Sequence, residues 1–160
     1  MTQYELEQYL GRYRKNVFAM ALFYLKSPND ADDVVQDVFL KLYTYTGTFD
    51  SEEHIRAWLI RCTVNRCKDI LHSNWYRFSE PLDAAGDKVH TDAPAEEGRV
   101  YGMLKKLGRN NRVALYLYYY EGYSTEEIAR MLGISVIAVT SRLKRGRKQL
   151  KKLLTDTKED

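Results

Sequence analysis

The chain has 160 residues, of which 44% are hydrophobic and 29% are charged. This is the composition of a soluble globular protein, and it excludes disorder along most of the length. No apolar run approaches the ~18 residues that a membrane span needs, and the N-terminus lacks the basic-then-apolar pattern of a secretion signal. We therefore expect a cytoplasmic protein without membrane insertion.

Charge is unevenly distributed, although the net charge is only +3. Residues 1–75 carry 9 basic and 10 acidic groups, residues 76–98 carry 2 and 6, and residues 99–160 carry 14 and 6. Residues 79–98 offer little to bury and hold two of the three prolines, which predicts a flexible acidic linker. Helical periodicity elsewhere predicts an all-α fold of two small helical domains, 1–78 and 99–160. The basic second domain is expected to face a polyanion.

Three helices are expected before the linker, at about residues 3–26, 30–46 and 52–75. Asn29 or Asp30 is expected to cap the second helix. The outward face of this second helix carries Asp33, Gln36, Asp37 and Leu40. An exposed leucine among carboxylates is a candidate protein-docking surface. A single exposed leucine is nevertheless common on ordinary surfaces, so this alternative stays open.

The third expected helix carries a polar stripe opposite its apolar side. The stripe consists of Arg61, Asn65, Lys68 and His72. Aromatic residues accompany it: Phe49 in the preceding loop, and Trp75, Tyr76 and Phe78 after it. Cations that follow a backbone beside aromatic rings that stack on bases suit single-stranded or opened DNA. The alternative is an ordinary polar helix face, and Arg66 on the apolar side has no explanation in the sequence.

Four helices are expected after the linker, at about residues 99–107, 111–120, 125–132 and 136–154. Ser124 and Glu127 form a capping box, Gly133 suits a helix-ending left-handed residue, and Ser135 can cap the next helix. The small Ala129 and the β-branched Val139 allow the two helices to cross closely. This pattern predicts a helix-turn-helix rather than a plain helical hairpin.

The last helix presents a basic face on the side opposite its leucines and valines. The face contains Ile137, Ser141, Lys144, Arg145 and Lys148. In a helix-turn-helix, this face of the second helix reads base edges in the major groove. Four cations beside it suit phosphate contacts: Arg142, Arg147, Lys151 and Lys152. A solvated basic surface is the alternative.

The remaining features are expected to be structural. The tyrosine-rich block at residues 116–123 is interpreted mainly as core packed against the helix-turn-helix, with a base-stacking platform as the minor alternative. Cys62 and Cys67 are interpreted as buried thiols, because their spacing with His72 fits no tetrahedral metal motif. No enzyme motif occurs in the sequence, so neither catalytic residues nor a cofactor is expected.

Three segments, in this order, resemble bacterial sigma factors of the extracytoplasmic-function group. The segment 30–43 (DADDVVQDVFLKLY) resembles the polymerase-binding helix, 54–71 (HIRAWLIRCTVNRCKDIL) the −10 helix, and 118–154 the −35-binding module. The resemblance covers most of the chain. One departure is Leu107-Gly108-Arg109, where the family often has Leu-Pro, and it leaves the start of that helix open.

The resemblance implies a role for each surface. Asp33, Gln36, Asp37 and Leu40 would dock on the clamp helices of the polymerase largest subunit. Residues 49–53 would capture a flipped −10 base, with Asn65 lining the pocket, and Ser141, Lys144 and Arg145 would read the −35 element. The implied partners are core RNA polymerase, promoter DNA and an inhibitory anti-sigma factor. Two other classes remain open, a free-standing repressor or activator and a nucleic-acid enzyme.

Overall fold

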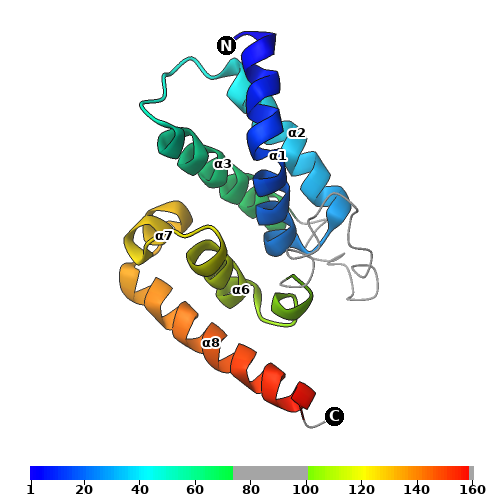
Figure 1. Cartoon of the computed structure of the whole chain (residues 1–160), viewed down its shortest axis with the longest axis vertical. Helices are drawn as coiled ribbons and strands as arrows, with labels where there is room; N and C mark the ends of the chain where they lie inside the picture. The colour runs from blue at the N-terminus through cyan, green and yellow to red at the C-terminus, as the bar shows by residue number, and fades with distance from the viewer. Residues whose placement is uncertain (74–100, 159–160) are drawn as a thin grey trace. The chain divides into compact units, whose positions relative to one another are not determined.

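The computed structural model describes residues 1–73 and 101–158, and the chain divides into two compact units, Met1–Pro94 and Ala95–Asp160 (Figure 1). Every described element is helical, which confirms the predicted all-α fold. The expected linker, residues 79–98, lies outside the described residues, as do Trp75, Tyr76 and Phe78.

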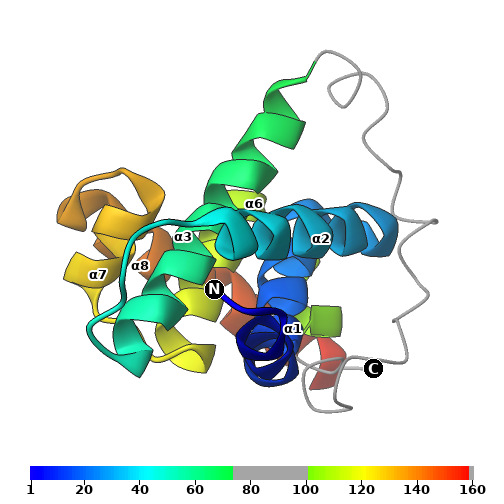
Figure 2. The same cartoon turned by 90° about the horizontal axis from the view of Figure 1, so that it is seen from above.

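The first unit consists of three mutually packed helices: α1 (Gln3–Leu25), α2 (Pro28–Thr44) and α3 (Glu52–His72). A connection of two residues, Lys26 and Ser27, forces α1 and α2 to run antiparallel (Figure 1). Figure 2 views the same helices from above, with α1 seen nearly end-on. Residues Val17–Leu25 of α1 are all buried and form the centre of this unit.

The start of α2 differs from the sequence expectation. Ser27 is the N-cap, and its Oγ accepts a hydrogen bond of 3.2 Å from the backbone N–H of Asp30. Pro28 is the first residue of α2. A proline is favourable there, because the first turn of a helix needs no internal hydrogen bond from its N–H groups. The predicted caps at Asn29 or Asp30 are therefore wrong by two or three residues.

The second unit begins with helical residues 101–104 and continues with α6 (Arg109–Leu115), a π-helical turn (Tyr116–Tyr120), α7 (Thr125–Leu132) and α8 (Val136–Lys158). Gly108 is the N-cap of α6, so this helix starts two residues before the predicted position 111. The departure at residues 107–109 thus moves a helix boundary and leaves the helix in place.

The tyrosine block is only partly core, which corrects the sequence interpretation. Tyr116 and Tyr123 are buried, whereas Tyr118, Tyr119 and Tyr120 are 37%, 60% and 38% exposed. The Tyr116 hydroxyl donates a 2.7 Å hydrogen bond to Oε1 of Glu121, which is also buried. Successive helical residues point about 100° apart, so no single core face can take up a run of consecutive tyrosines.

At Gly146, α8 passes close to α6. A Cβ atom at this position would lie 2.8 Å from Cδ1 and 3.0 Å from Cγ of Leu115, which is buried. We expect Gly146→Ala to lower the free energy of local unfolding by about 1 kcal/mol, because overpacking outweighs the gain in helix propensity. Native-state hydrogen exchange of the α6 and α8 amides measures the effect.

A matched control for this substitution is available in α1. At Gly11 a Cβ atom would meet nothing within 4 Å. Gly11→Ala should therefore raise the protection of α1 amides by about 1 kcal/mol. A rise in protection for Gly146→Ala as well would contradict the close-approach argument.

Candidate nucleic-acid and protein interfaces

The outward face of α2 borders a groove. Asp33 and Gln36 are exposed, and Leu40 is 64% exposed. The groove has a volume of about 630 Å³ and is lined from α1 and α2 by Leu6, Leu10, Arg14, Asp32, Val35, Gln36, Phe39, Leu40 and Tyr43. Leu40 is thus part of a mainly apolar depression rather than a single exposed leucine. A concave apolar surface with a polar rim suits a protruding apolar side chain of a protein partner.

Asp37 has a second role inside the unit. Nε of Arg66 on α3 donates a hydrogen bond of 2.7 Å to Oδ2 of Asp37 on α2, and the two side chains are 43% and 44% exposed. This ion pair explains Arg66, which the sequence left unexplained. Of the four predicted docking residues, Gln36 and Leu40 line the groove, whereas Asp33 and Asp37 do not, and Asp37 instead links α2 to α3.

The polar stripe of α3 is accessible. Arg61, Asn65 and His72 are exposed and Lys68 is half-buried, while Ile55, Leu59 and Cys62 on the other side are buried. Residues seven apart on a helix point in nearly the same direction. Asn65 therefore follows Trp58 along one line of the helix, roughly 10 Å further on. This line leads directly from the stripe to the loop before α3.

Phe49 belongs to an aromatic cluster at that end of α3. Its ring centroid lies 5.2 Å from that of Tyr45, 5.2 Å from that of His54 and 5.6 Å from that of Trp58. Tyr45 and Trp58 are also in contact, with centroids 4.9 Å apart. Sequence reasoning missed Tyr45 and Trp58, although their spacing of four residues from Phe49 and His54 was a signal. Half-buried Phe49 supports the loop from within this cluster.

The first turn of α3 is tied to α1 through Glu52. Nη1 of Arg12 donates a hydrogen bond of 2.6 Å to Oε1 of Glu52, and the hydroxyl of Tyr13 donates one to Oε2. Burial, together with the hydrogen bond to Glu52 and its charge, raises the pKa of Tyr13 to about 12. The hydrogen bond from Tyr13 in turn lowers the pKa of Glu52. Spacing along the chain gave no sign of this contact.

The predicted helix-turn-helix is present in α7 and α8. The capping box closes with Ser124 Oγ accepting from the Glu127 N–H at 3.2 Å and Glu127 Oε1 accepting from the Ser124 N–H at 3.0 Å. Gly133 has the left-handed φ of 69° that ends α7. Ser135 Oγ accepts from the Ala138 N–H at 3.1 Å and so caps α8. All three local predictions are confirmed.

The predicted reading face of α8 is open to solvent. Ile137 is 79% exposed, an unusual position for a β-branched apolar side chain. Lys144, Arg145 and Lys148 are exposed, Ser141 and Arg142 are half-buried, and Val139 and Leu143 on the other side are buried. The helix therefore offers apolar, hydroxyl and cationic groups on one accessible side, which is the set that base edges and phosphates require.

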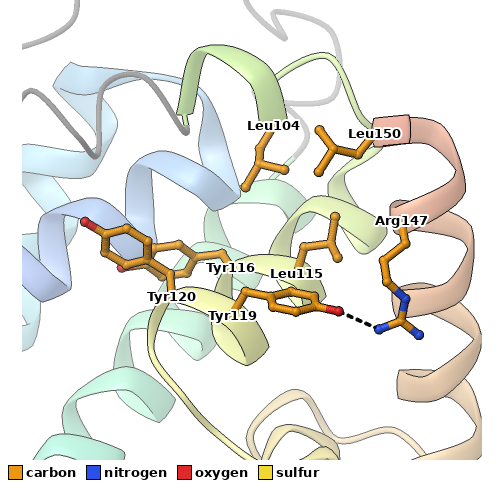
Figure 3. A pocket seen from close by; sticks show the side chains of 7 residues that line it. All are labelled: Leu104, Leu115, Tyr116, Tyr119, Tyr120, Arg147 and Leu150. Atoms are coloured by element: carbon orange, nitrogen blue, oxygen red, sulfur yellow. Dashed lines mark hydrogen bonds between the residues drawn. The ribbon is translucent and has the colours of Figure 1, made fainter. Parts of the chain in front are cut away.

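Arg147 differs from the other cations of α8. Its Nη1 donates a hydrogen bond of 2.8 Å to the hydroxyl of Tyr119 (Figure 3). Both residues border a mainly apolar pocket of about 400 Å³, with Leu104, Leu115, Tyr116, Tyr120 and Leu150 as the other lining residues (Figure 3). Arg147 is thus partly engaged within its own unit, whereas Lys144 and Arg145 stand on the reading face.

Both cysteines are buried free thiols, as predicted, and burial raises the pKa of Cys62. Among residues 1–73 and 101–158, no group of three or more His, Cys, Asp or Glu side chains is arranged to hold a metal ion. None of the helices in these two ranges is both long and apolar enough to cross a membrane.

A helix-turn-helix in one unit, and a grooved three-helix unit with an accessible polar stripe, define a two-domain DNA-binding protein. Residues 10–77 match the family "Sigma-70 region 2", and residues 97–150 match "Sigma-70, region 4". The ECF RNA polymerase sigma factor SigM of Mycobacterium tuberculosis is 30% identical over 153 residues, which are 95% of this chain and 78% of SigM. The chain belongs to the ECF group of the sigma-70 family.

Further similar proteins agree with this assignment. The RNA polymerase sigma factor CnrH of Cupriavidus metallidurans is 34% identical over 78% of this chain and 73% of its own length. The structure of CnrH in complex with the cytosolic domain of CnrY has a TM-score of 0.64. The Bartonella quintana sigma factor RpoE, solved with the anti-sigma factor NepR, has a TM-score of 0.72 over 94% of this chain and 97% of that one. At 22% identity, RpoE supports the fold alone.

Proposed function

We propose that this chain binds core RNA polymerase through α2, recognises the −35 and −10 promoter elements and opens the DNA for transcription initiation. The observation that carries the proposal is the exposed face of α8, where Ile137, Lys144 and Arg145 project from a capped helix-turn-helix. The second unit alone would suit any DNA-binding regulator. The groove beside Leu40 and the polar stripe of α3 favour an initiation factor, since a simple repressor needs neither.

The proposed division of labour follows the two units. Residues 1–78 would bind polymerase and the −10 element, and residues 99–160 would bind the −35 element. Residues 79–98 would be the linker between these two domains. The α2 surface is Asp33, Gln36, Asp37 and Leu40. The −10 surface is Phe49, Arg61, Asn65, Lys68 and His72, and the −35 surface is Ile137, Ser141, Arg142, Lys144, Arg145, Arg147 and Lys148. The two family matches, to residues 10–77 and 97–150, support these bounds.

Run-off transcription with purified core polymerase on genomic fragments, with mapped 5′ ends, tests the function. Start sites that depend on this chain and share two upstream elements are expected. Duplex binding without any polymerase association would favour a free-standing repressor or activator. Nuclease or nucleotide-turnover activity of the chain alone would favour an enzyme, a class that none of its named relatives supports.

The proposed setting is the cytoplasm, where polymerase and promoter DNA are found. An anti-sigma factor is a further proposed partner, by analogy with CnrH, whose structure was solved in complex with the cytosolic domain of CnrY. Inhibition of run-off transcription by a co-purifying protein would test this part, and transcription insensitive to any bound protein would contradict it.

Substitutions on the −35 surface should distinguish residues that contact bases from residues that contact phosphates. We expect Lys144→Ala and Arg145→Ala to weaken binding to the preferred −35 duplex by roughly 1–3 kcal/mol each and to relax sequence preference, because a base-edge contact carries discrimination. Lys151→Ala should weaken all duplexes alike and lower the salt slope by about one. Fluorescence anisotropy at several salt concentrations measures both quantities. If Lys144→Ala lowers the affinity for specific and unrelated DNA equally, Lys144 does not contact base edges.

A further inference from the structure

The loop between α2 and α3 is supported on two sides, and one of these supports comes from a different helix. The loop covers residues 45–51 and contains Phe49. Its aromatic side chains pack on α3, and its last residue leads into Glu52, which is bound by α1. The order of the loop thus depends on residues far from it in the sequence.

On the first side, Tyr45 fills the inside of the loop. A Cβ atom at Gly47 would lie 2.5 Å from Oη and 2.6 Å from Cζ of Tyr45, so the loop backbone passes directly over this ring. The same ring stacks on Phe49 and contacts Trp58. Only a residue without a side chain fits over a tyrosine held in this way.

On the second side, α1 holds the start of α3. Arg12 and Tyr13 each bind one oxygen of the Glu52 carboxylate. Arg12 and Glu52 are 55% and 62% exposed, so the ion pair alone contributes little to stability. Its geometric effect is larger, because a carboxylate held at both oxygens has a fixed orientation. His54, in the first turn of the helix, accepts a 3.1 Å hydrogen bond at Nδ1 from the Asp50 N–H and extends this order into the loop.

We propose that Arg12 and Tyr13 are positioning residues for promoter opening, which act through Glu52 on the loop that presents Phe49. The inference rests on the proposed −10 function and adds α1 to it. Extruding a base from the duplex costs a few kcal/mol, and binding of the extruded base must offset this cost. A loop that is already ordered binds the base more favourably, because its conformational entropy was lost on folding and not on binding.

The test uses the full chain with core polymerase on a promoter mapped by run-off transcription. The double variant Arg12→Ala with Tyr13→Phe removes both contacts and leaves Glu52 in place. Arg12→Lys is the conservative rescue, since an ammonium group still pairs with the carboxylate. Lys15→Ala is the matched control, an exposed cation on the same helix outside these contacts. Permanganate reactivity of −10 thymines, affinity for core polymerase, and hydrogen exchange of residues 46–51 are measured for each.

We expect the double variant to lower thymine reactivity about fivefold, the size of coupling within one hydrogen-bond network, and to speed exchange of the loop amides. Core affinity should stay at the wild-type value, and Arg12→Lys with native Tyr13 should restore reactivity. Unchanged reactivity, or a loss of reactivity in parallel with core affinity, would overturn the proposal. If the wild-type chain itself opens no promoter, the −10 function is wrong and the proposal falls with it. If the wild-type chain opens the promoter but Lys15→Ala lowers thymine reactivity as much as the double variant does, only the proposal is overturned.

Discussion

Leu40→Arg combined with Gln36→Ala is expected to weaken binding to core RNA polymerase roughly 10- to 100-fold, the effect of losing a central interface anchor. The reason is the groove beside α2, whose apolar lining includes Leu40. A guanidinium group in that position would lose its hydration on docking, and the apolar contact made by Leu40 would be lost as well. Surface plasmon resonance with immobilised core polymerase measures the change.

The fold should tolerate this double substitution, because both side chains are exposed while Val34 and Val38 on the other side of α2 form the core. Circular dichroism of the free protein checks this point. Leu154→Arg is the matched control, since Leu154 is a leucine of the other unit that is 44% exposed. If the double variant binds as tightly as the wild type, the α2 face is wrong. If Leu154→Arg causes an equal loss, the effect is not specific to the groove.

Asn65→Ala and Phe49→Ala should each reduce promoter opening roughly tenfold while duplex binding stays intact. A base meets this part of α3 only after it has left the stack, and extrusion costs a few kcal/mol that its pocket must return. Asn65 contributes an exposed amide on the helix line that begins at Trp58, and Phe49 holds the loop through its three aromatic neighbours. Permanganate footprinting around −10 measures opening, and a −35 duplex measures binding.

Asn110→Ala provides the same chemical change on an exposed asparagine of the second unit, and opening should be unaffected by it. Equal thymine reactivity for Asn65→Ala and the wild type would remove Asn65 from the mechanism. A loss of duplex binding in either variant would point to misfolding or to the wrong surface, because these residues belong to the unit without the helix-turn-helix.

Some residues of the proposed DNA and docking surfaces are free to meet a partner, whereas others already form contacts within their own unit. On α8, the accessible side chains are cationic over several turns and need no rearrangement to meet a duplex. Arg147 is the exception, because its hydrogen bond to Tyr119 would compete with the proposed phosphate contact. On α2, Asp37 is paired with Arg66, which would compete with the proposed contact to a partner. Lys144, Arg145, Gln36 and Leu40 are therefore the more informative positions for mutation.

Features that depend on near neighbours along the chain could be predicted from the residues alone. The capping box at Ser124, the left-handed Gly133, the buried stripe of α2 and the exposed face of α8 all follow from interactions three or four residues apart, which local pattern encodes. The family resemblance rested on the same helical segments. At the start of α2 the local prediction was wrong, because the expected caps were Asn29 or Asp30 and the N-cap is Ser27.

The contacts between helices could not be predicted in this way. Arg66 meets Asp37 across 29 positions, and Arg12 meets Glu52 across 40. The ring of Trp58 reaches Phe49 because the loop turns back on α3, and three of the tyrosines after position 117 remain exposed because the core of a small unit takes up only one side of a helix. Such contacts depend on crossing angles and loop paths set by the packing of whole helices, which no local spacing specifies.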